Sequence, residues 1–482
     1  MFRGIAKVTL CFVLTTIIAL TSRAQNGEKW DLRKCVEYAL QNNISIKQAD
    51  LQIEFAKLDF QQSKLSQYPS ANFSGNVGYS SGRNQDPTSF GLITTGYLSN
   101  GYSLQSSVDL FSWFTKKNTV ILRDLNVQAT KAGADKARDD IGFNVAVAYL
   151  QILLAKEQAN LARIQLSQTK VQVENTRKQV EVGNLPELSA AQIESQYATD
   201  SANLITAETN TQQLLLQMKA LLQLGADADF DIAQVPVDLI PVESIADLQP
   251  ASVYKLALQN MPQQKVDELN VKAAQKNVEI AKGSMYPTFS LFGSLGSTFN
   301  NKAQEIISKT QINPAIGTVT VGSTTYQVYP AAPYYIYNYG KISYFDQVNQ
   351  NFRQSIGLGV NVPIFNGASL RTSWQRSKLS LKQSQLIKEQ NSFTLQQDIY
   401  KAYNDAAAAL QKFNANKKTV ESAQKAYDFA SKRYELNLLS TFELLSSQNA
   451  LLTAKIQMLY SQYDYVFKIK LLEYYKGQGI KL

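Results

Sequence analysis

Four segments of the chain alternate apolar and polar residues with a period of two, the pattern of a strand whose two faces differ. Phe73, Val77 and Tyr79 alternate with small polar residues, and the most regular run extends from Phe352 to Ile364. Each run has about the length of a tilted membrane-crossing strand. We therefore predict such strands at residues 70–81, 101–112, 287–299 and 352–365. The small, hydrophilic polar face suits a water-filled lumen, with a soluble sheet as the alternative.

Long stretches between these strands carry the pattern of coiled-coil helices. No proline interrupts residues 116–182, and apolar residues from Val127 to Leu166 recur at steps of three, four or seven. A helix of this length measures roughly 100 Å, more than an ordinary domain contains. The expected helices lie at about 30–67, 116–182, 187–224, 250–285, 368–436 and 441–476.

The chain also repeats itself. The sequence ALQN occurs at 39–42 and again at 257–260, 218 residues later, and further matches follow without a gap. A second register, 254 residues apart, begins further on and pairs Ala148-Tyr149 with Ala402-Tyr403. We predict a tandem duplication, with repeats at 25–240 and 241–482. The difference of 36 residues implies an enlarged, tyrosine-rich loop at about 300–351, expected outside the cell, where it caps the mouth or, alternatively, binds a partner.

The first 24 residues read as a secretory signal peptide. Arg3 and Lys7 precede an apolar run at 8–20, which is too short to span a membrane, and Ala24 ends a cleavage site. Removal of this segment lowers the net charge from +9 to +6. Cys35 then stands alone, so we expect no intrachain disulfide.

The chain contains no histidine, which removes the usual general base and the commonest metal ligand. No nucleophile–base pairing, metal cluster or phosphate loop is evident in the sequence. The mild, unclustered charge does not indicate nucleic-acid binding. We expect no catalytic residue, no enzyme activity, no cofactor and no metal.

Four membrane strands cannot close a barrel. The open edges of their sheet would expose backbone amides to lipid, at a cost of several kcal/mol each, and the smallest barrels have about eight strands. The chain must therefore oligomerise. Aromatic residues at the helix-proximal strand ends resemble the girdle at a membrane interface. The girdle residues are Tyr68, Phe111, Trp113, Phe114, Tyr286 and Phe365.

These features together resemble the TolC family of outer membrane efflux proteins. The resemblance rests on the duplicated plan, on Tyr68-Pro69 and Tyr286-Pro287 before strands, and on the sequence VPIFNG at 362–367. It covers nearly the whole mature chain. It implies an α+β membrane protein in which three copies form a twelve-stranded outer-membrane β-barrel and a long α-helical periplasmic barrel. It also implies docking to a periplasmic adaptor (membrane fusion) protein and an inner-membrane transporter of the RND, ABC or MFS type.

The resemblance assigns adaptor contacts to the turns between the long helices. These turns comprise Gly183, Asn184, Leu185 and Pro186 in the first repeat, and Asn437, Leu438, Leu439 and Ser440 in the second. Glu443 is the candidate for an acidic ring at the closed aperture. The alternative for Glu443 is a carboxylate at a helix start, favoured by the helix dipole.

We therefore expect a passive exit duct of a tripartite efflux or type I secretion system. One alternative is a surface adhesin or structural coiled-coil protein with a barrel anchor, which would not require a duplication. Another is the periplasmic adaptor itself, which would have one hairpin and β-rich segments.

Overall fold

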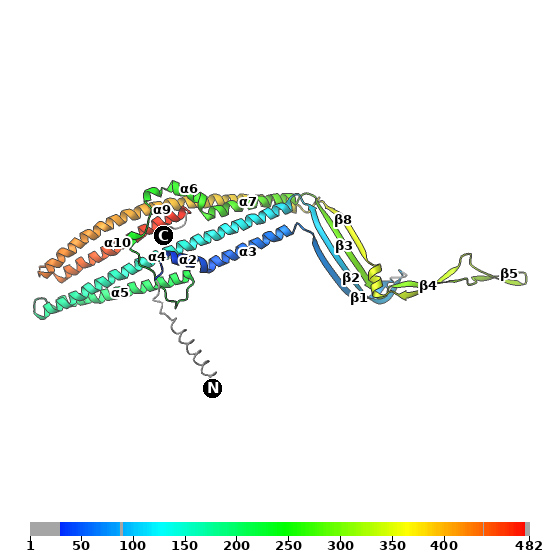
Figure 1. Cartoon of the computed structure of the whole chain (residues 1–482), viewed down its shortest axis with the longest axis horizontal. Coiled ribbons are helices and arrows are strands. Elements are labelled where there is room, and N and C mark those ends of the chain that lie inside the picture. The colour runs from blue at the N-terminus through cyan, green and yellow to red at the C-terminus, as the bar shows by residue number, and fades with distance from the viewer. Residues whose placement is uncertain (1–28, 87–89, 437, 478–482) are drawn as a thin grey trace, which may run out of the picture. The chain divides into compact units, whose positions relative to one another are not determined.

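The computed structural model describes residues 29–86, 90–436 and 438–477 (Figure 1). The expected signal peptide at 1–24 and the tip residue Asn437 lie outside the described residues. The described residues form two compact units. The first, the helical unit, comprises residues 29–58, 124–274 and 380–477; the second, the strand unit, comprises 59–86, 90–123 and 275–379.

The strand unit contains a four-stranded antiparallel sheet of order β1-β2-β3-β8. Its strands are β1 (Ser70–Gln85), β2 (Leu92–Phe111), β3 (Thr288–Asn300) and β8 (Arg353–Asn361). The first two strands are longer than expected, because the polar residues that suggested a loop pair as a hairpin from Gln85↔Leu92 onward. β8 ends before the expected residue 365, since Pro363 has no N–H group to donate to a ladder.

The long helices occupy the proline-free stretches. They are α4 (Thr115–Glu181), α5 (Glu187–Leu222), α9 (Ser369–Glu435) and α10 (Thr441–Tyr475). α4 and α9 contain 67 residues each, so each is about 100 Å long. Among the described helices, none combines the length and the apolar character needed to cross a membrane.

The helices expected at 30–67 and 250–285 are each divided in two. The first consists of α2 (Leu32–Asn42) and α3 (Ile44–Leu65), the second of α6 (Pro250–Asn260) and α7 (Pro262–Gly283). Asn43 is extended, and its side chain accepts a hydrogen bond from the Ser45 amide. Met261 is extended because Pro262 follows it. The two breaks are 218 residues apart, the spacing of the sequence repeat.

Each short helix packs on one hairpin of the helical unit. Cys35 and Ala39 of α2 are buried in a core that includes Ile152 of α4 and Met218 of α5. Val253 and Ala257 of α6 belong to a second core with Ile399 of α9 and Leu472 of α10. Ala39 and Ala257 are again 218 residues apart, so the two repeats place equivalent residues in equivalent cores.

The segment expected as an enlarged loop is largely ordered secondary structure. β4 (Gln304–Ile312) pairs with β7 (Tyr334–Lys341), and β5 (Gly317–Val321) pairs with β6 (Thr324–Val328). Gly322, with φ of +65°, occupies the first position of the two-residue β5–β6 turn, where a type II′ hairpin requires glycine. The expectation of a loop was therefore wrong. Tyr334 and Ile336 lie on one face of the β4–β7 pair, and Tyr339 and Ile306 lie on the other. Apolar residues on both faces hide the alternation that identifies a strand.

The short helix α8 (Tyr344–Gln350) follows β7 and supplies hydrogen-bond partners to the last residue of β3. β3 pairs with β8 only as far as Gly296. Beyond that point the buried Gln347 amide accepts from Asn300 N–H at 2.9 Å and donates to Asn300 C=O at 3.0 Å. The Gln347 side chain thus replaces a peptide group of the missing strand.

Candidate channel wall, membrane surface and helix tips

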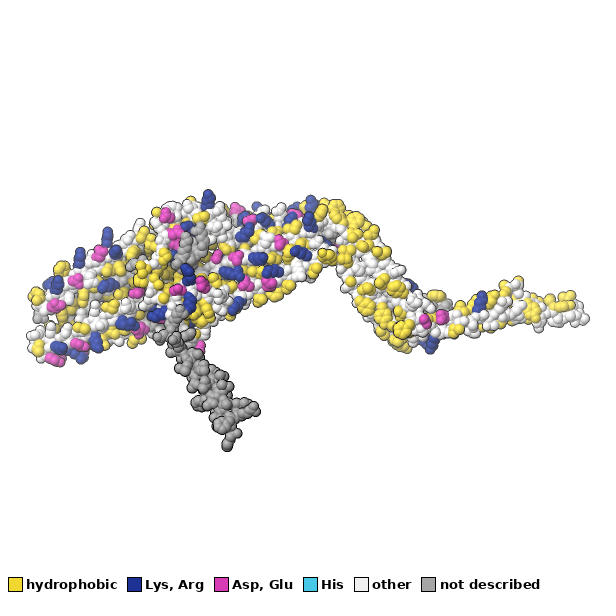
Figure 2. Space-filling model, viewed as in Figure 1, with side chains coloured by type: hydrophobic (Ala, Val, Ile, Leu, Met, Phe, Trp, Pro, Cys, Tyr) yellow, Lys and Arg dark blue, Asp and Glu magenta, His cyan; other side chains and the backbone are white. Residues whose placement is uncertain are grey.

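The register of the four-stranded sheet places apolar side chains on one face and polar side chains on the other. Opposite residues in antiparallel strands share a face. One row joins Phe73, Leu104 and Leu295, and another joins Val108, Leu291 and Leu358. Figure 2 shows hydrophobic side chains gathered over these strands. The apolar face is exposed, most strongly on the edge strands, where Val77 is 71% and Ile356 80% exposed.

The opposite face carries short polar side chains that hydrogen-bond across the strands. A row joins Asn72, Gln105, Ser294 and Ser355. The Ser294 and Ser355 hydroxyls are 2.8 Å apart, and an equivalent serine pair between β1 and β2 is 2.7 Å apart. Such a face suits contact with water. Phe292 is an exception, since it lies on this face against Gly357.

The predicted girdle residues are all in the strand unit, and the structure brings four of them together. Trp113 stacks near Tyr286 with ring centroids 4.8 Å apart, and its indole N–H donates to Pro287 C=O at 2.7 Å. Phe111 contacts both Trp113 and Phe114. Tyr68 and Phe365 are exposed, at 69% and 86%. Exposed aromatic rings at strand ends are the arrangement found at membrane interfaces.

In the first turn between the long helices, α4 ends with a Schellman motif. Gly183 has φ of +79°, its N–H donates to Val180 C=O, and Asn184 N–H donates to Gln179 C=O. The left-handed conformation explains the glycine at this position. α5 then begins after Pro186, which has extended geometry. Leu185 is half-buried, whereas the adjacent Val182 and Leu188 are exposed.

The second turn starts α10 with a capping box. The Ser440 hydroxyl accepts from Glu443 N–H at 3.3 Å, and the Glu443 carboxylate accepts from Ser440 N–H at 3.0 Å. The bonds from Ser440 lower the pKa of Glu443. The structure therefore assigns Glu443 a capping role, while its side chain remains exposed. Leu438 and Phe442 present exposed apolar surface beside it, and Leu439 is half-buried.

A buried polar cluster, which the sequence pattern did not reveal, connects the two hairpins of the helical unit. Asp200 of α5 is 1% exposed and accepts hydrogen bonds from Thr169 Oγ1 at 2.6 Å and Gln196 Nε2 at 2.8 Å. Gln448 Nε2 of α10 donates to Thr169 at 3.5 Å. Nearer the turns, the Tyr434 hydroxyl lies 3.4 Å from Thr176 Oγ1 of α4. The packing of the two hairpins here depends on matched polar groups.

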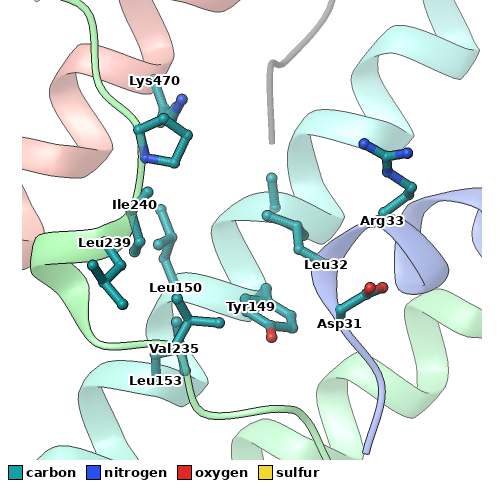
Figure 3. Close-up of a pocket in the computed structure, with 12 residues that line it drawn as sticks. Asp31, Leu32, Arg33, Tyr149, Leu150, Leu153, Val235, Leu239, Ile240 and Lys470 are labelled. Carbon is teal, nitrogen blue, oxygen red and sulfur yellow. The ribbon is translucent and has the colours of Figure 1, made fainter.

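A cavity of about 450 Å³ lies beside α4 in the helical unit (Figure 3). Its lining is mainly aliphatic, including Leu150, Leu153 and Leu239. The Tyr149 hydroxyl at its wall donates to Ala233 C=O at 2.7 Å, and burial raises the pKa of Tyr149 to about 12. Lys470 forms an ion pair with Glu473 at 2.8 Å. These groups are engaged in structural contacts.

A sheet with one apolar and one wet face, continued by helices about 100 Å long, defines a class of protein. It is an outer-membrane channel subunit with a long periplasmic extension. The comparison with known families agrees: the model of the outer membrane efflux protein family matches residues 35–223 and 253–468. The chain belongs to this family, which comprises efflux proteins and not enzymes.

Characterised relatives are similar over most of their length. The chain is 22% identical to the outer membrane efflux protein BepC of Brucella suis, over 96% of this chain and 89% of BepC. It is 21% identical to the outer membrane protein TolC of Escherichia coli, over 87% of this chain and 76% of TolC.

Solved structures share the fold at low sequence identity. A CusC structure aligns with a TM-score of 0.75 at 18% identity, over 92% of this chain and 91% of CusC. The outer membrane protein VceC from Vibrio cholerae aligns with a TM-score of 0.72 at 17% identity, over 93% and 97% of the two chains. The predicted α+β fold with long helices is thereby confirmed, and the family match confirms the outer-membrane location.

Proposed function

We propose that three copies of this chain form the exit duct of a tripartite efflux or type I secretion system. The channel is a passive conduit; its helix turns dock to a periplasmic adaptor, which connects it to an energised inner-membrane transporter. The open edges of the four-stranded sheet carry this proposal. β1 and β8 each have one side without a strand partner in the described structure, and unpaired amides in lipid cost several kcal/mol each. Three copies supply twelve strands, enough to close a barrel.

Exposed apolar stripes on two helices support the same assembly. On α9, Leu379, Leu386 and Phe393 lie seven residues apart and are 51–72% exposed. On α3, Leu51 and Leu58 form a similar stripe and are about 60% exposed. A seven-residue repeat is the spacing of a coiled-coil seam. The chain runs from α3 into the strands and from the strands into α9, so α3 of one copy and α9 of the next would pair as antiparallel helices.

The turns between the long helices are the proposed docking surface. Five exposed apolar side chains surround them in the described part of the helical unit: Val182, Leu188, Leu436, Leu438 and Phe442. Apolar surface at the end of a polar helical hairpin is typical of a protein–protein contact.

Opening of the duct is proposed to occur by outward movement of the hairpins at the turns, when the adaptor binds. The buried cluster around Asp200 would then have to separate or slide. Disulfides engineered between neighbouring turns should block export, and reduction of these disulfides should restore export. Unimpaired export in the oxidised, fully cross-linked protein would contradict this gating mechanism.

The assembly is tested by native mass spectrometry of the full-length mature protein in mild detergent. A trimer is expected, and a stable monomer would overturn the proposed function. The variant Leu386→Glu should lower the temperature at which the trimer dissociates, because it places a carboxylate in the apolar stripe. Leu386→Met is the matched control, since it retains an apolar side chain of similar volume.

A further inference from the structure

The inserted segment forms a two-stranded ribbon whose apolar surface is exposed on both sides. In β4 and β7, the register places Ile312, Tyr334 and Ile336 on one face, here called the isoleucine face. Tyr335 and Tyr337 lie on the opposite face, here called the tyrosine face, with ring centroids 6.5 Å apart. Lys309 lies 3.8 Å from the Tyr335 ring centroid on the tyrosine face.

The exposed aromatic area is large for a structure of this size. Tyr326, Tyr329, Tyr334 and Tyr339 are each about half exposed, as are the two tyrosines just named. With about 200 Å² per aromatic side chain, these six expose roughly 600 Å². This area is divided among the two faces of the β4–β7 ribbon and residues 326–329, so each ribbon face has apolar surface of its own. An isolated two-stranded hairpin is also marginally stable in water, so the ribbon needs cover on both faces.

The chemistry of the ribbon favours another ribbon as its cover. Residues 304–341 contain only three charged side chains, Glu305, Lys309 and Lys341. Copies of the ribbon therefore approach one another with little repulsion. Its two faces differ, so a head-to-tail contact joins the isoleucine face of one copy to the tyrosine face of the next. Contacts of this kind close into a ring when a rotation axis relates the copies.

The distances fit such a ring. Twelve strands about 4.8 Å apart, tilted by about 40°, give a barrel radius of roughly 12 Å. Equivalent points on three copies then lie about 20 Å apart. β4 contains 9 residues, which span about 30 Å. Each ribbon is thus long enough to reach its neighbours from its attachment at the end of β3.

We infer that the β4–β7 ribbons of three copies pack face to face, isoleucine face on tyrosine face, as a ring at the outer end of the channel. This inference rests on the proposed trimer. The partner for each exposed face is a second copy of this chain, and the ring adds a contact beyond the strands and helices that build the channel.

Disulfide cross-linking tests the ring. Thr310→Cys places a thiol on the isoleucine face and Tyr337→Cys one on the tyrosine face. Both positions are exposed, and the natural Cys35 is buried. On oxidation, the double variant should give covalent dimers and trimers, whereas each single variant should remain monomeric on a denaturing gel. Lys417→Cys, on the exposed surface of α9, measures cross-linking by random collision.

The outcomes separate the ring from the trimer. If native mass spectrometry shows a trimer and the double variant does not cross-link above the Lys417→Cys level, the ring is wrong and the trimer stands. Equal cross-linking by a single variant would also overturn the alternating-face contact. Cross-linking of the double variant to a different envelope protein in whole cells would show that the ribbon binds a foreign partner. Absence of the trimer itself would remove the proposed function.

Discussion

The buried carboxylate of Asp200 gives a quantitative test of how the two helical hairpins are held together. Thr169→Val keeps the shape of the side chain but removes its hydroxyl, which donates to Asp200 at 2.6 Å. A hydrogen bond to a charged group contributes about 1.5–3 kcal/mol, and a buried acceptor left unpaired costs about as much. We expect local opening of α5 around Asp200 to become easier by about 2 kcal/mol.

Hydrogen exchange measured by mass spectrometry reports this local opening. A change of about 2 kcal/mol corresponds to roughly 30-fold faster exchange of the amides near Asp200. Thr209→Val, on the exposed surface of α5, is the matched control and should leave the exchange rate unchanged. The double variant Thr169→Val/Asp200→Leu should not recover the loss, because it also removes the acceptor of the Gln165 and Gln196 amides and leaves these donors unpaired.

Two results would refute this reasoning. If Thr169→Val exchanges at the rate of the natural protein, the hydroxyl does not stabilise the carboxylate. If the double variant exchanges more slowly than Thr169→Val, the Gln165 and Gln196 amides do not need Asp200 as their acceptor.

Four further predictions concern single positions. Ser440→Ala removes the capping box and should cost about 1 kcal/mol in local opening at the start of α10, seen as lower amide protection there. The pKa of Glu443 is lowered in the folded protein. The stabilising effect of the Glu443 carboxylate should therefore be present above its pKa in the unfolded chain and be lost as the pH falls through its pKa in the folded protein. Constant protection factors of the first amides of α10 across this pH range would contradict the capping role. Burial raises the pKa of the Cys35 thiol to about 12, so iodoacetamide should modify it at pH 8 only after unfolding. Rapid labelling of the native protein would disprove its burial. Gly183→Ala forces a methyl side chain into a left-handed conformation and should destabilise the first turn by about 1 kcal/mol, measured as faster exchange at residues 178–184 than in a Gly133→Ala control within α4.

The long helices and the two sheet faces could be predicted from sequence because both depend on local signals. The expected helix at 116–182 is found at Thr115–Glu181, since proline, glycine and the seven-residue spacing determine its ends and its seam. The faces of the sheet follow directly from a period of two. A strand extending back to Leu92 was missed, because its pairing with Gln85 depends on register and not on alternation.

The seam of the helices near the turns was predicted less well. Ala162 and Leu166 were expected as seam residues but are half-buried, while Gln165 and Thr169 are buried. Polar residues can occupy such positions only when partners on other helices satisfy them, and Asp200 is such a partner. A single sequence carries no sign of that pairing, apart from the seven-residue spacing of Thr169 and Thr176.

The last helix shows a different limit. In α10, Leu444 and Leu451 are buried, whereas Leu445 and Leu452, which have the same seven-residue spacing, are half-buried. Leu444 is adjacent to Leu445, and Leu451 is adjacent to Leu452, so the heptad pattern fits either choice. The rotation of the helix by one residue is decided by its neighbours, and the sequence pattern alone does not distinguish the alternatives.

The Gln347 amide replaces a peptide group at the end of β3. The hydrogen bonding of the four-stranded sheet therefore does not depend on the inserted ribbon. Gln347 of α8 already satisfies the backbone N–H and C=O of Asn300. The segment between β3 and α8 can therefore change in length and composition. A foreign peptide spliced into the β5–β6 turn should therefore leave the pairing of β1, β2, β3 and β8 unchanged.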